Sequence, residues 1–327
     1  MAIQIDSVKT NRPCWREGDD WSRAEGESMR SGLDADQVAS AFPELAEIAA
    51  TGDVSANQKC VFRAVMNGEG LALKLIPISG LDSPLEAEGI ATILARMERE
   101  IGILRAGGSR HLPALGPLEP GVRAVAGEQF AYFTEEFIDG ESIRETLAAG
   151  GRLPVPEVAR LGCGVGRAIE RLRVLQKVHR DVKPANIMRR SETGEYVLID
   201  PGYALDMSGP TLTRVLAIPG TLAYMSPEQT VLDLRRTLDF RSDLYSLGVV
   251  MYEALTGVHP YRTPAMSDQE VVEAIRTVRP VEREGAALGL EGIWQPILRL
   301  LKKRPHQRFS AVGALVSALA PFTEVAE

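Results

Sequence analysis

The sequence predicts an α+β protein with a smaller β-rich N-terminal lobe that carries one main helix, followed by a larger, mostly helical C-terminal lobe. Between Phe42 and Ile138, runs rich in β-branched and aromatic residues alternate with turn residues, which is typical of strands and hairpins. After Gly151, apolar residues recur at intervals of three and four, the period of a helix that packs on a core. A chain of 327 residues is long enough for more than one hydrophobic core.

We expect three parts: an N-terminal arm over residues 1–40, a β-rich lobe over residues 41–138 and a helical lobe over residues 139–327. The arm is polar, and no period of 2 or 3.6 residues persists in it. It holds Trp15 and Trp21. These leave two interpretations open, a flexible segment or one anchored on the main body by its indole rings.

Composition and charge exclude several classes of protein. The chain is 45% hydrophobic and 25% charged, as expected of a globular protein. Its net charge of −7 and pI of about 5.4 argue against nucleic-acid binding. Three widely spaced cysteines form neither a disulfide framework nor a zinc motif, and they favour a reducing cytoplasm. No apolar run reaches membrane-span or signal-peptide length, so we expect a soluble protein without a membrane partner.

A β-hairpin is predicted early in the β-rich lobe. Its strands are residues 61–65 and 71–76, and the turn residues 67–70 read Asn-Gly-Glu-Gly. The second strand places Lys74 inside an apolar run. A lone lysine there either extends to a sheet edge or needs a buried partner.

A helix is predicted from near Pro84 to Leu104. Its apolar stripe consists of Ile90, Ile93, Met97, Ile101 and Leu104. Glu100 lies on this stripe, whereas Glu98 points elsewhere. Because a carboxylate on a buried face needs a partner, we predict an ion pair between Glu100 and Lys74.

A further strand is predicted at residues 130–138, followed by a long helix that ends shortly before residue 179. The stripe of this helix is Val158, Leu161, Val165, Ala168, Leu172 and Leu175. Residues 179–188 then read His-Arg-Asp-Val-Lys-Pro-Ala-Asn-Ile-Met. Pro184 stops a helix from continuing, so the run is predicted to be a loop, and loops on a rigid scaffold often carry catalytic groups.

This run resembles the catalytic loop of protein kinases, in which His-Arg-Asp is followed five residues after the Asp by Asn. Lys183 with Pro184 resembles the serine/threonine branch, in its bacterial, eukaryotic-like form. The alternative is a polar surface loop that matches by chance. The resemblance implies a bilobal kinase fold and transfer of the ATP γ-phosphate to serine and threonine hydroxyls of proteins, with autophosphorylation.

The resemblance implies roles for four polar residues in catalysis. Asp181 would accept the proton of the attacking hydroxyl, and Lys183 would steady the γ-phosphate. Asn186 and Asp200 would bind Mg²⁺ through oxygen atoms. Asp200 begins Asp-Pro-Gly, where the family has Asp-Phe-Gly, so Pro201 stands in place of Phe.

The resemblance also implies an ATP site. Lys74 would hold the α- and β-phosphates, with Glu100 orienting it. The residues expected around the adenine are Val61, Ala72 and Met188, through apolar contact, and Glu136 to Ile138, through backbone groups. Glu135 would border the back of the adenine pocket, where a charge is unusual.

The segment after Asp200 resembles a kinase activation segment. Residues 220–228 would form its end, and Glu228 would pair with Arg308. Asp243 opens an apolar helix, as it does in the family. Arg180 would bind a phosphorylated loop, with Thr211 and Thr213 as the acceptors of phosphate.

The glycine-rich loop of the family is missing. Counting back from Val61, the three expected glycine positions hold Val54, Ala56 and Lys59. Glycine lets the backbone approach phosphates closely, so its loss favours an alternative: a pseudokinase that acts as a nucleotide-binding or scaffold module. A small-molecule kinase of related fold is disfavoured because the chain contains an activation segment.

Overall fold

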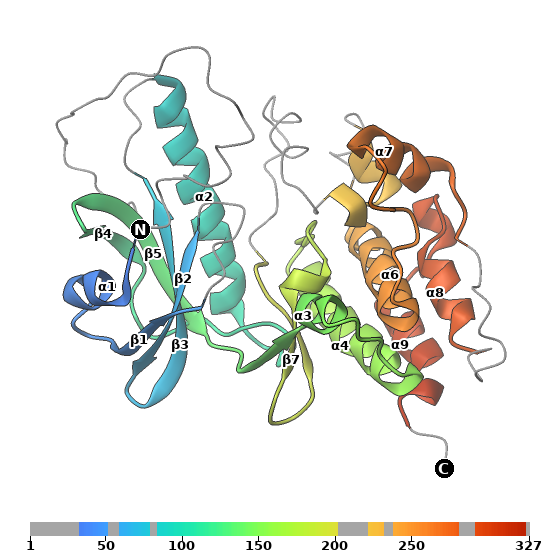
Figure 1. The fold of residues 1–327 in the computed structure, drawn as a ribbon, viewed down its shortest axis with the longest axis horizontal. Coiled ribbons are helices and arrows are strands. Elements are labelled where there is room, and N and C mark those ends of the chain that lie inside the picture. The colour runs from blue at the N-terminus through green and yellow to red at the C-terminus, as the bar shows by residue number, and fades with distance from the viewer. Residues whose placement is uncertain are drawn as a thin grey trace. The chain divides into compact units, whose positions relative to one another are not determined.

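The computed structural model describes residues 33–51, 59–78, 84–201, 222–231, 238–280 and 292–324. Within these ranges the chain divides into two compact units (Figure 1). The first unit draws its described residues from the chain up to Ile101 and from Ala114–Phe137. The second comprises Gly102–Pro113 and the described chain from Ile138 onward.

The first unit contains a five-stranded antiparallel sheet with the strand order β1-β2-β3-β5-β4. The strands are β1 Ala46–Ala50, β2 Cys60–Met66, β3 Glu69–Pro77, β4 Gly121–Val125 and β5 Glu128–Glu136. The predicted hairpin is confirmed as β2 and β3. Its turn residues Asn67 and Gly68 have φ angles of 54° and 84°, the positive values that a tight hairpin turn requires.

One face of this sheet packs on a helix that was not predicted, α1 (Ala35–Ala41). Val38 of α1 and the following Phe42 share a buried core with Leu71, Leu73 and other apolar residues of that face. The expectation of an irregular arm as far as residue 40 is therefore wrong for α1. Its sequence signal was a capping box, in which Asp34 and Gln37 bond reciprocally across the first turn.

Helix α2 (Pro84–Ala106) confirms the predicted long helix and ends two residues beyond its expected end. Its apolar stripe is buried at Met97 and Ile101. The last turn of α2 and the segment to Pro113 group with the second unit. Ile103 and Leu112 lie in the core of that unit. The expected division had a single boundary after residue 138. In the structure the second unit also includes the earlier segment Gly102–Pro113.

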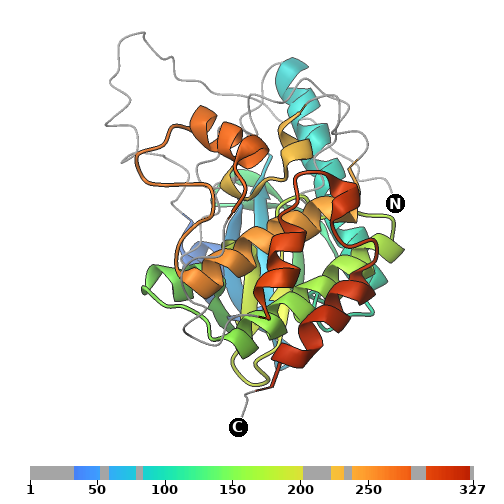
Figure 2. The same ribbon diagram turned by 90° about the vertical axis from the view of Figure 1, so that its right-hand side faces the viewer.

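The second unit is mostly helical (Figure 2). A three-stranded antiparallel sheet joins β6 Gly140–Ser142, β7 Ile187–Arg190 and β8 Tyr196–Leu198. The helices are α3 Ile143–Ala148, α4 Val155–Val174, α6 Phe240–Thr256, α7 Asp268–Thr277, α8 Trp294–Leu300 and α9 Val312–Leu319. Short 3-10 turns are η1 Pro184–Asn186, η2 Leu222–Tyr224, η3 Pro227–Thr230, η6 Pro305–Gln307 and η7 Ala320–Phe322.

Helices α4 and α6 form the centre of this unit. The predicted stripe of α4 is buried from Val158 to Leu172. A Cβ atom at Gly248 of α6 would lie 2.6 Å from the Cβ of Leu300, so only glycine allows α8 to pack this closely. Among the residues that the structure describes, no helix is long and apolar enough to cross a bilayer.

Candidate active site

The loop after α4 is fixed by one buried carboxylate. Asp243, in the first turn of α6, accepts hydrogen bonds of 2.7 Å from the backbone N–H groups of His179 and Arg180. Burial raises the pKa of Asp243, although these two N–H groups and the charges of His179 and Arg180 act in the opposite direction. Helix α6 therefore fixes the backbone of this loop without using the side chains of the residues that follow Arg180.

Arg180 adopts a strained backbone conformation, with a φ angle of 68° that residues other than glycine rarely take. Its N–H is held by Asp243, and its carbonyl oxygen accepts a hydrogen bond of 3.0 Å from Nε2 of Gln229. Gln229 follows Glu228 in η3, and its Oε1 accepts from the N–H and hydroxyl of Ser226. Gln229 thus ties η3 to the residue before Asp181, a link that the sequence did not predict.

Asp181, Lys183 and Asn186 lie together at the end of this loop. Lys183 Nζ is 2.8 Å from Asp181 Oδ2, and Asn186 Nδ2 donates to the same oxygen at 3.0 Å and to the Asp181 carbonyl at 2.8 Å. The predicted loop is confirmed, with Pro184 beginning the short turn η1. Both neighbours therefore contact the same carboxylate oxygen, Oδ2, and neither of these two contacts involves Oδ1.

Asn186 and Asp200 are brought close by the β7–β8 hairpin. The N–H of Ile199 donates to the Asn186 carbonyl at 2.9 Å, so the next residue, Asp200, lies beside Asn186. Asp200 has a φ angle of 56°, which aspartate tolerates better than most residues. Since Asn186 uses its amide donors on Asp181, its Oδ1 remains as an acceptor for a cation.

These oxygen donors fit Mg²⁺, which typically binds one or two protein groups together with substrate phosphates and water. Within the described ranges, no group of three or more His, Cys, Asp or Glu side chains forms a complete metal cage. A site made only from protein side chains, such as a structural zinc site, is therefore not present in that part of the chain.

In the first unit, Lys74 Nζ lies 2.9 Å from Glu100 Oε1, which confirms the predicted ion pair. Both residues are buried, with 3% and 2% of their surface exposed, whereas Glu98 is exposed. The helical phase that placed Glu100 on the buried stripe of α2 is therefore correct.

Two charged residues join this pair, and the sequence did not predict their contacts. Lys59 Nζ is 2.9 Å from Glu100 Oε2, and Glu135 Oε1 is 2.8 Å from Lys74 Nζ. All four side chains are buried, and we call Lys59, Glu100, Lys74 and Glu135 the lysine–glutamate cluster. Glu135 lies on the same face of the sheet as Lys74, two residues from Phe133, which pairs directly with Lys74. This alternation was the available signal.

The residues expected around the adenine lie on strands β2, β3, β5 and β7 and just after β5. Val61 of β2 pairs with Lys74, and Ala72 precedes Lys74 by two residues, so all three lie on one face of the sheet. Glu136 ends β5 and accepts a hydrogen bond of 3.3 Å from Ala114 N. Ile138 is buried at the start of the second unit, and Met188 lies half-buried in β7.

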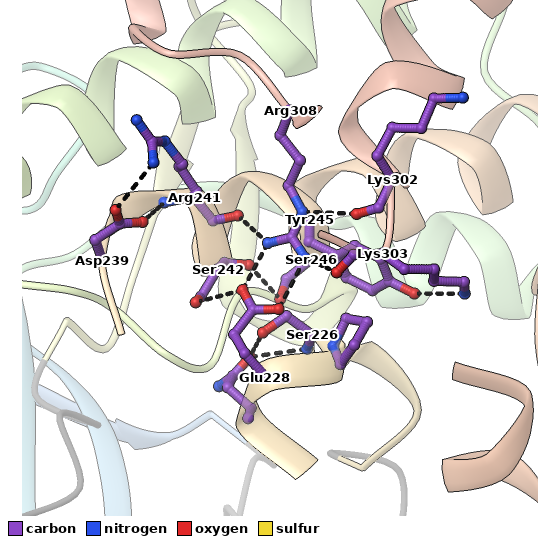
Figure 3. Close-up of polar contacts among 12 residues, drawn as sticks. Ser226, Glu228, Asp239, Arg241, Ser242, Tyr245, Ser246, Lys302, Lys303 and Arg308 are labelled. Atoms are coloured by element: carbon purple, nitrogen blue, oxygen red, sulfur yellow. Dashed lines mark hydrogen bonds and ion pairs between the residues drawn. The ribbon is translucent and has the colours of Figure 1, made fainter. Parts of the chain in front are cut away.

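A buried clamp joins Glu228 to Arg308 (Figure 3). Arg308 Nη1 and Nη2 donate to the two carboxylate oxygens at 2.6 and 2.8 Å, which confirms the predicted pair. Ser242 adds a hydrogen bond of 2.8 Å to Glu228. Burial alone raises the pKa of Glu228, but the hydrogen bonds and charge of Arg308 outweigh it and hold the pKa of this carboxyl below its ordinary value. Thr211 and Thr213 lie outside the described residues.

A family model for the protein kinase domain matches residues 60–319. The chain belongs to the protein kinase family. The two units carry the β-rich and helical halves of the bilobal kinase fold, as the sequence predicted. The match begins at β2 and ends with α9, so it contains every described residue named above for the site except Lys59.

Several bacterial kinases are similar in sequence. A probable serine/threonine-protein kinase PknB of Bifidobacterium longum is 36% identical over 191 residues, which are 57% of this chain and 26% of that protein. PknB of Mycobacterium leprae is 31% identical over 212 residues, 63% of this chain and 32% of that kinase. A probable serine/threonine-protein kinase of Streptomyces coelicolor is 34% identical over 226 residues, 68% and 32% of the two chains. This protein kinase thus spans about a third or less of the length of these relatives.

Proposed function

We propose that this protein kinase transfers the γ-phosphate of ATP to serine or threonine hydroxyls of proteins. The observation that carries the proposal is the group formed by the buried Asp181 and Asn186 and the partly buried Lys183, in a loop whose backbone is held by Asp243. A carboxylate held at two points with a cation beside it suits proton abstraction next to a transferring phosphate. The names of the similar bacterial kinases support the same specificity.

In this proposal, Asp181 orients the substrate hydroxyl and accepts its proton as the oxygen attacks the γ-phosphorus, while the bond from that phosphorus to the β–γ bridging oxygen breaks and ADP leaves. Lys183, whose ammonium lies 2.8 Å from Asp181, contacts the γ-phosphate and stabilises the charge that moves onto it. Both side chains are held in place before substrate arrives, which reduces the entropy lost on reaching the reactive geometry.

Asn186 and Asp200 are proposed to hold Mg²⁺, and Lys74 to contact the ATP phosphates. When bound, Mg²⁺ neutralises phosphate charge. Glu100 positions Lys74, to which it is bonded at 2.9 Å. Val61, Ala72 and Met188 are proposed to contact the adenine ring, with backbone groups of Glu136 and Ile138 as its hydrogen-bonding partners.

The test is incorporation of labelled phosphate from γ-labelled Mg-ATP into a general protein substrate and into the chain itself. We expect incorporation by the wild type, and a loss of about 10²- to 10⁴-fold in Asp181→Asn, which keeps the shape but not the base. The matched control is Glu192→Gln, which makes the same change from carboxylate to amide at an exposed residue of the β7–β8 turn and should leave incorporation unchanged. Mg-ATP binding without any transfer by the wild type would contradict the proposal and favour a pseudokinase.

We also propose a cytoplasmic location, because ATP is supplied there and the described cysteines, Cys60 and Cys163, are free thiols. Fractionation of cells that express the tagged chain tests this. Recovery of the chain outside the cytoplasmic fraction would contradict it.

A further inference from the structure

Lys59 occupies an unusual place in the first unit. Its ammonium lies 2.9 Å from Oε2 of Glu100, while the ammonium of Lys74 lies 2.9 Å from Oε1 of the same carboxylate. Only 8% of the surface of Lys59 is exposed. One glutamate of α2 therefore holds two buried lysines, one from β3 and one from the residue directly before β2.

The position of Lys59 places it on the same face of the sheet as Lys74. Lys59 precedes Val61 by two residues, so the alternation of an extended chain places it on the face that carries Val61, Ala72 and Lys74. Its bond to Glu100 agrees with this, because Lys74 reaches Glu100 from the same face.

The charges of the lysine–glutamate cluster show why a second lysine matters. Lys74 lies between two carboxylates, Glu100 at 2.9 Å and Glu135 at 2.8 Å. Without Lys59 the cluster would hold one ammonium and two carboxylates, a net charge of −1 that repels a phosphate. With Lys59 it holds two of each and is neutral, and both ammoniums bind carboxylate oxygens, which phosphate oxygens resemble as acceptors.

We propose that Lys59 is a second phosphate-binding residue of the nucleotide site, positioned by Glu100, and that its ligand is the polyphosphate of a nucleoside di- or triphosphate. The inference rests on the proposed function, since it concerns the same ATP site. Lys59 supplies a side-chain cation for the phosphates, in a sequence whose expected glycine positions hold Val54, Ala56 and Lys59 itself.

The test compares binding of Mg-ATP, Mg-ADP and adenosine to the full chain by titration calorimetry. A lost charge-assisted hydrogen bond predicts that Lys59→Gln binds both nucleotides about tenfold to a hundredfold more weakly and adenosine equally well. Lys59→Arg, which keeps the charge, retains most of the affinity for Mg-ATP. Arg105→Gln removes an exposed charge from the last turn of α2, outside the sheet, and leaves all three affinities unchanged.

Each other outcome is decisive. Unchanged nucleotide affinity in Lys59→Gln overturns the inference, and so does an equal loss for adenosine and nucleotides, which would make Lys59 purely structural. If the wild type binds adenosine and nucleotides but transfers no phosphate, the proposed function fails while this inference still stands or falls by the binding data. If the wild type binds none of the three ligands, both are overturned.

A second measurement uses the wild type and does not depend on the folding of a variant. An ATP derivative with an acyl group on its γ-phosphate transfers that acyl group to a lysine amine near the phosphates and leaves as ATP. Peptide mapping should find acylated Lys59 as well as Lys74, with both modifications suppressed by excess Mg-ATP. Acylation of Lys74 without Lys59 would argue against a phosphate contact for Lys59.

Discussion

Two buried ion clusters, one in each unit of the kinase, differ in what their cations bind. In the clamp of the second unit, Arg308 gives all five of its N–H donors to fixed acceptors: the two oxygens of Glu228 and the backbone carbonyls of Arg241, Lys302 and Lys303. In the lysine–glutamate cluster of the first unit, Lys59 and Lys74 form ion pairs with the side-chain carboxylates of Glu100 and Glu135.

This difference is the one expected between a structural pair and the proposed phosphate-binding site. The donors of Arg308 are saturated by the protein, so a ligand could replace them only by breaking the fold. In the other cluster, the ion pairs of Lys59 and Lys74 join side chains to side chains, so exchanging such a pair for the proposed phosphate would leave the backbone bonds of the sheet intact. Burial and short ion pairs are common to both clusters, so neither feature separates the structural pair from the proposed phosphate-binding site.

The largest effect is expected from breaking the clamp. Arg308→Ala leaves Glu228 buried without its cation, and removing one partner of a buried pair typically costs about 3–5 kcal/mol. We expect a clearly lower melting temperature in thermal unfolding followed by circular dichroism. Arg304→Ala, an exposed arginine of the same segment, should melt like the wild type. An unchanged melting temperature for Arg308→Ala would show that the pair adds no stability.

A smaller effect is expected from changing the net charge of the lysine–glutamate cluster. Glu135→Gln removes one carboxylate from a neutral cluster and leaves a net charge of +1 around Lys74. We expect this variant to bind Mg-ATP roughly tenfold more tightly, about 1.4 kcal/mol, with adenosine binding unchanged. Titration calorimetry measures both. Weaker binding of Mg-ATP would mean that Glu135 positions Lys74 rather than competing for it.

The smallest effect is a pH dependence of the stability that the clamp contributes. Because the pKa of Glu228 in the folded state lies below its ordinary value, the stability from its ionised form is complete above the unfolded pKa of about 4.3. It is lost as the pH falls through the folded pKa. The difference in melting temperature between wild type and Glu228→Gln should therefore stay constant from pH 7 to about 5.5 and narrow below about 4.5. If the difference in melting temperature widened in acid, the pKa of Glu228 would be raised rather than lowered in the folded state.

The sequence by itself determined the elements whose signals are local. The turn at Asn67 and Gly68 defined the hairpin, and the apolar stripe of α2 gave the phase that made Glu100 the partner of Lys74. The spacing of Asp181, Lys183 and Asn186 predicted a catalytic loop through its resemblance to kinases, and the same resemblance paired Glu228 with Arg308. Helix α1 was missed, although its capping box at Asp34 and Gln37 was visible in the sequence.

Only the tertiary structure decided how charges far apart in the chain share their partners. Lys59 and Glu100 are 41 residues apart, and Gln229 and Arg180 are 49 apart. Periodicity shows which face a side chain takes, but it does not show which side chain from another element meets it there. That choice depends on strand register and helix packing, and these joined Lys59 and Glu135 to the predicted pair of Lys74 and Glu100.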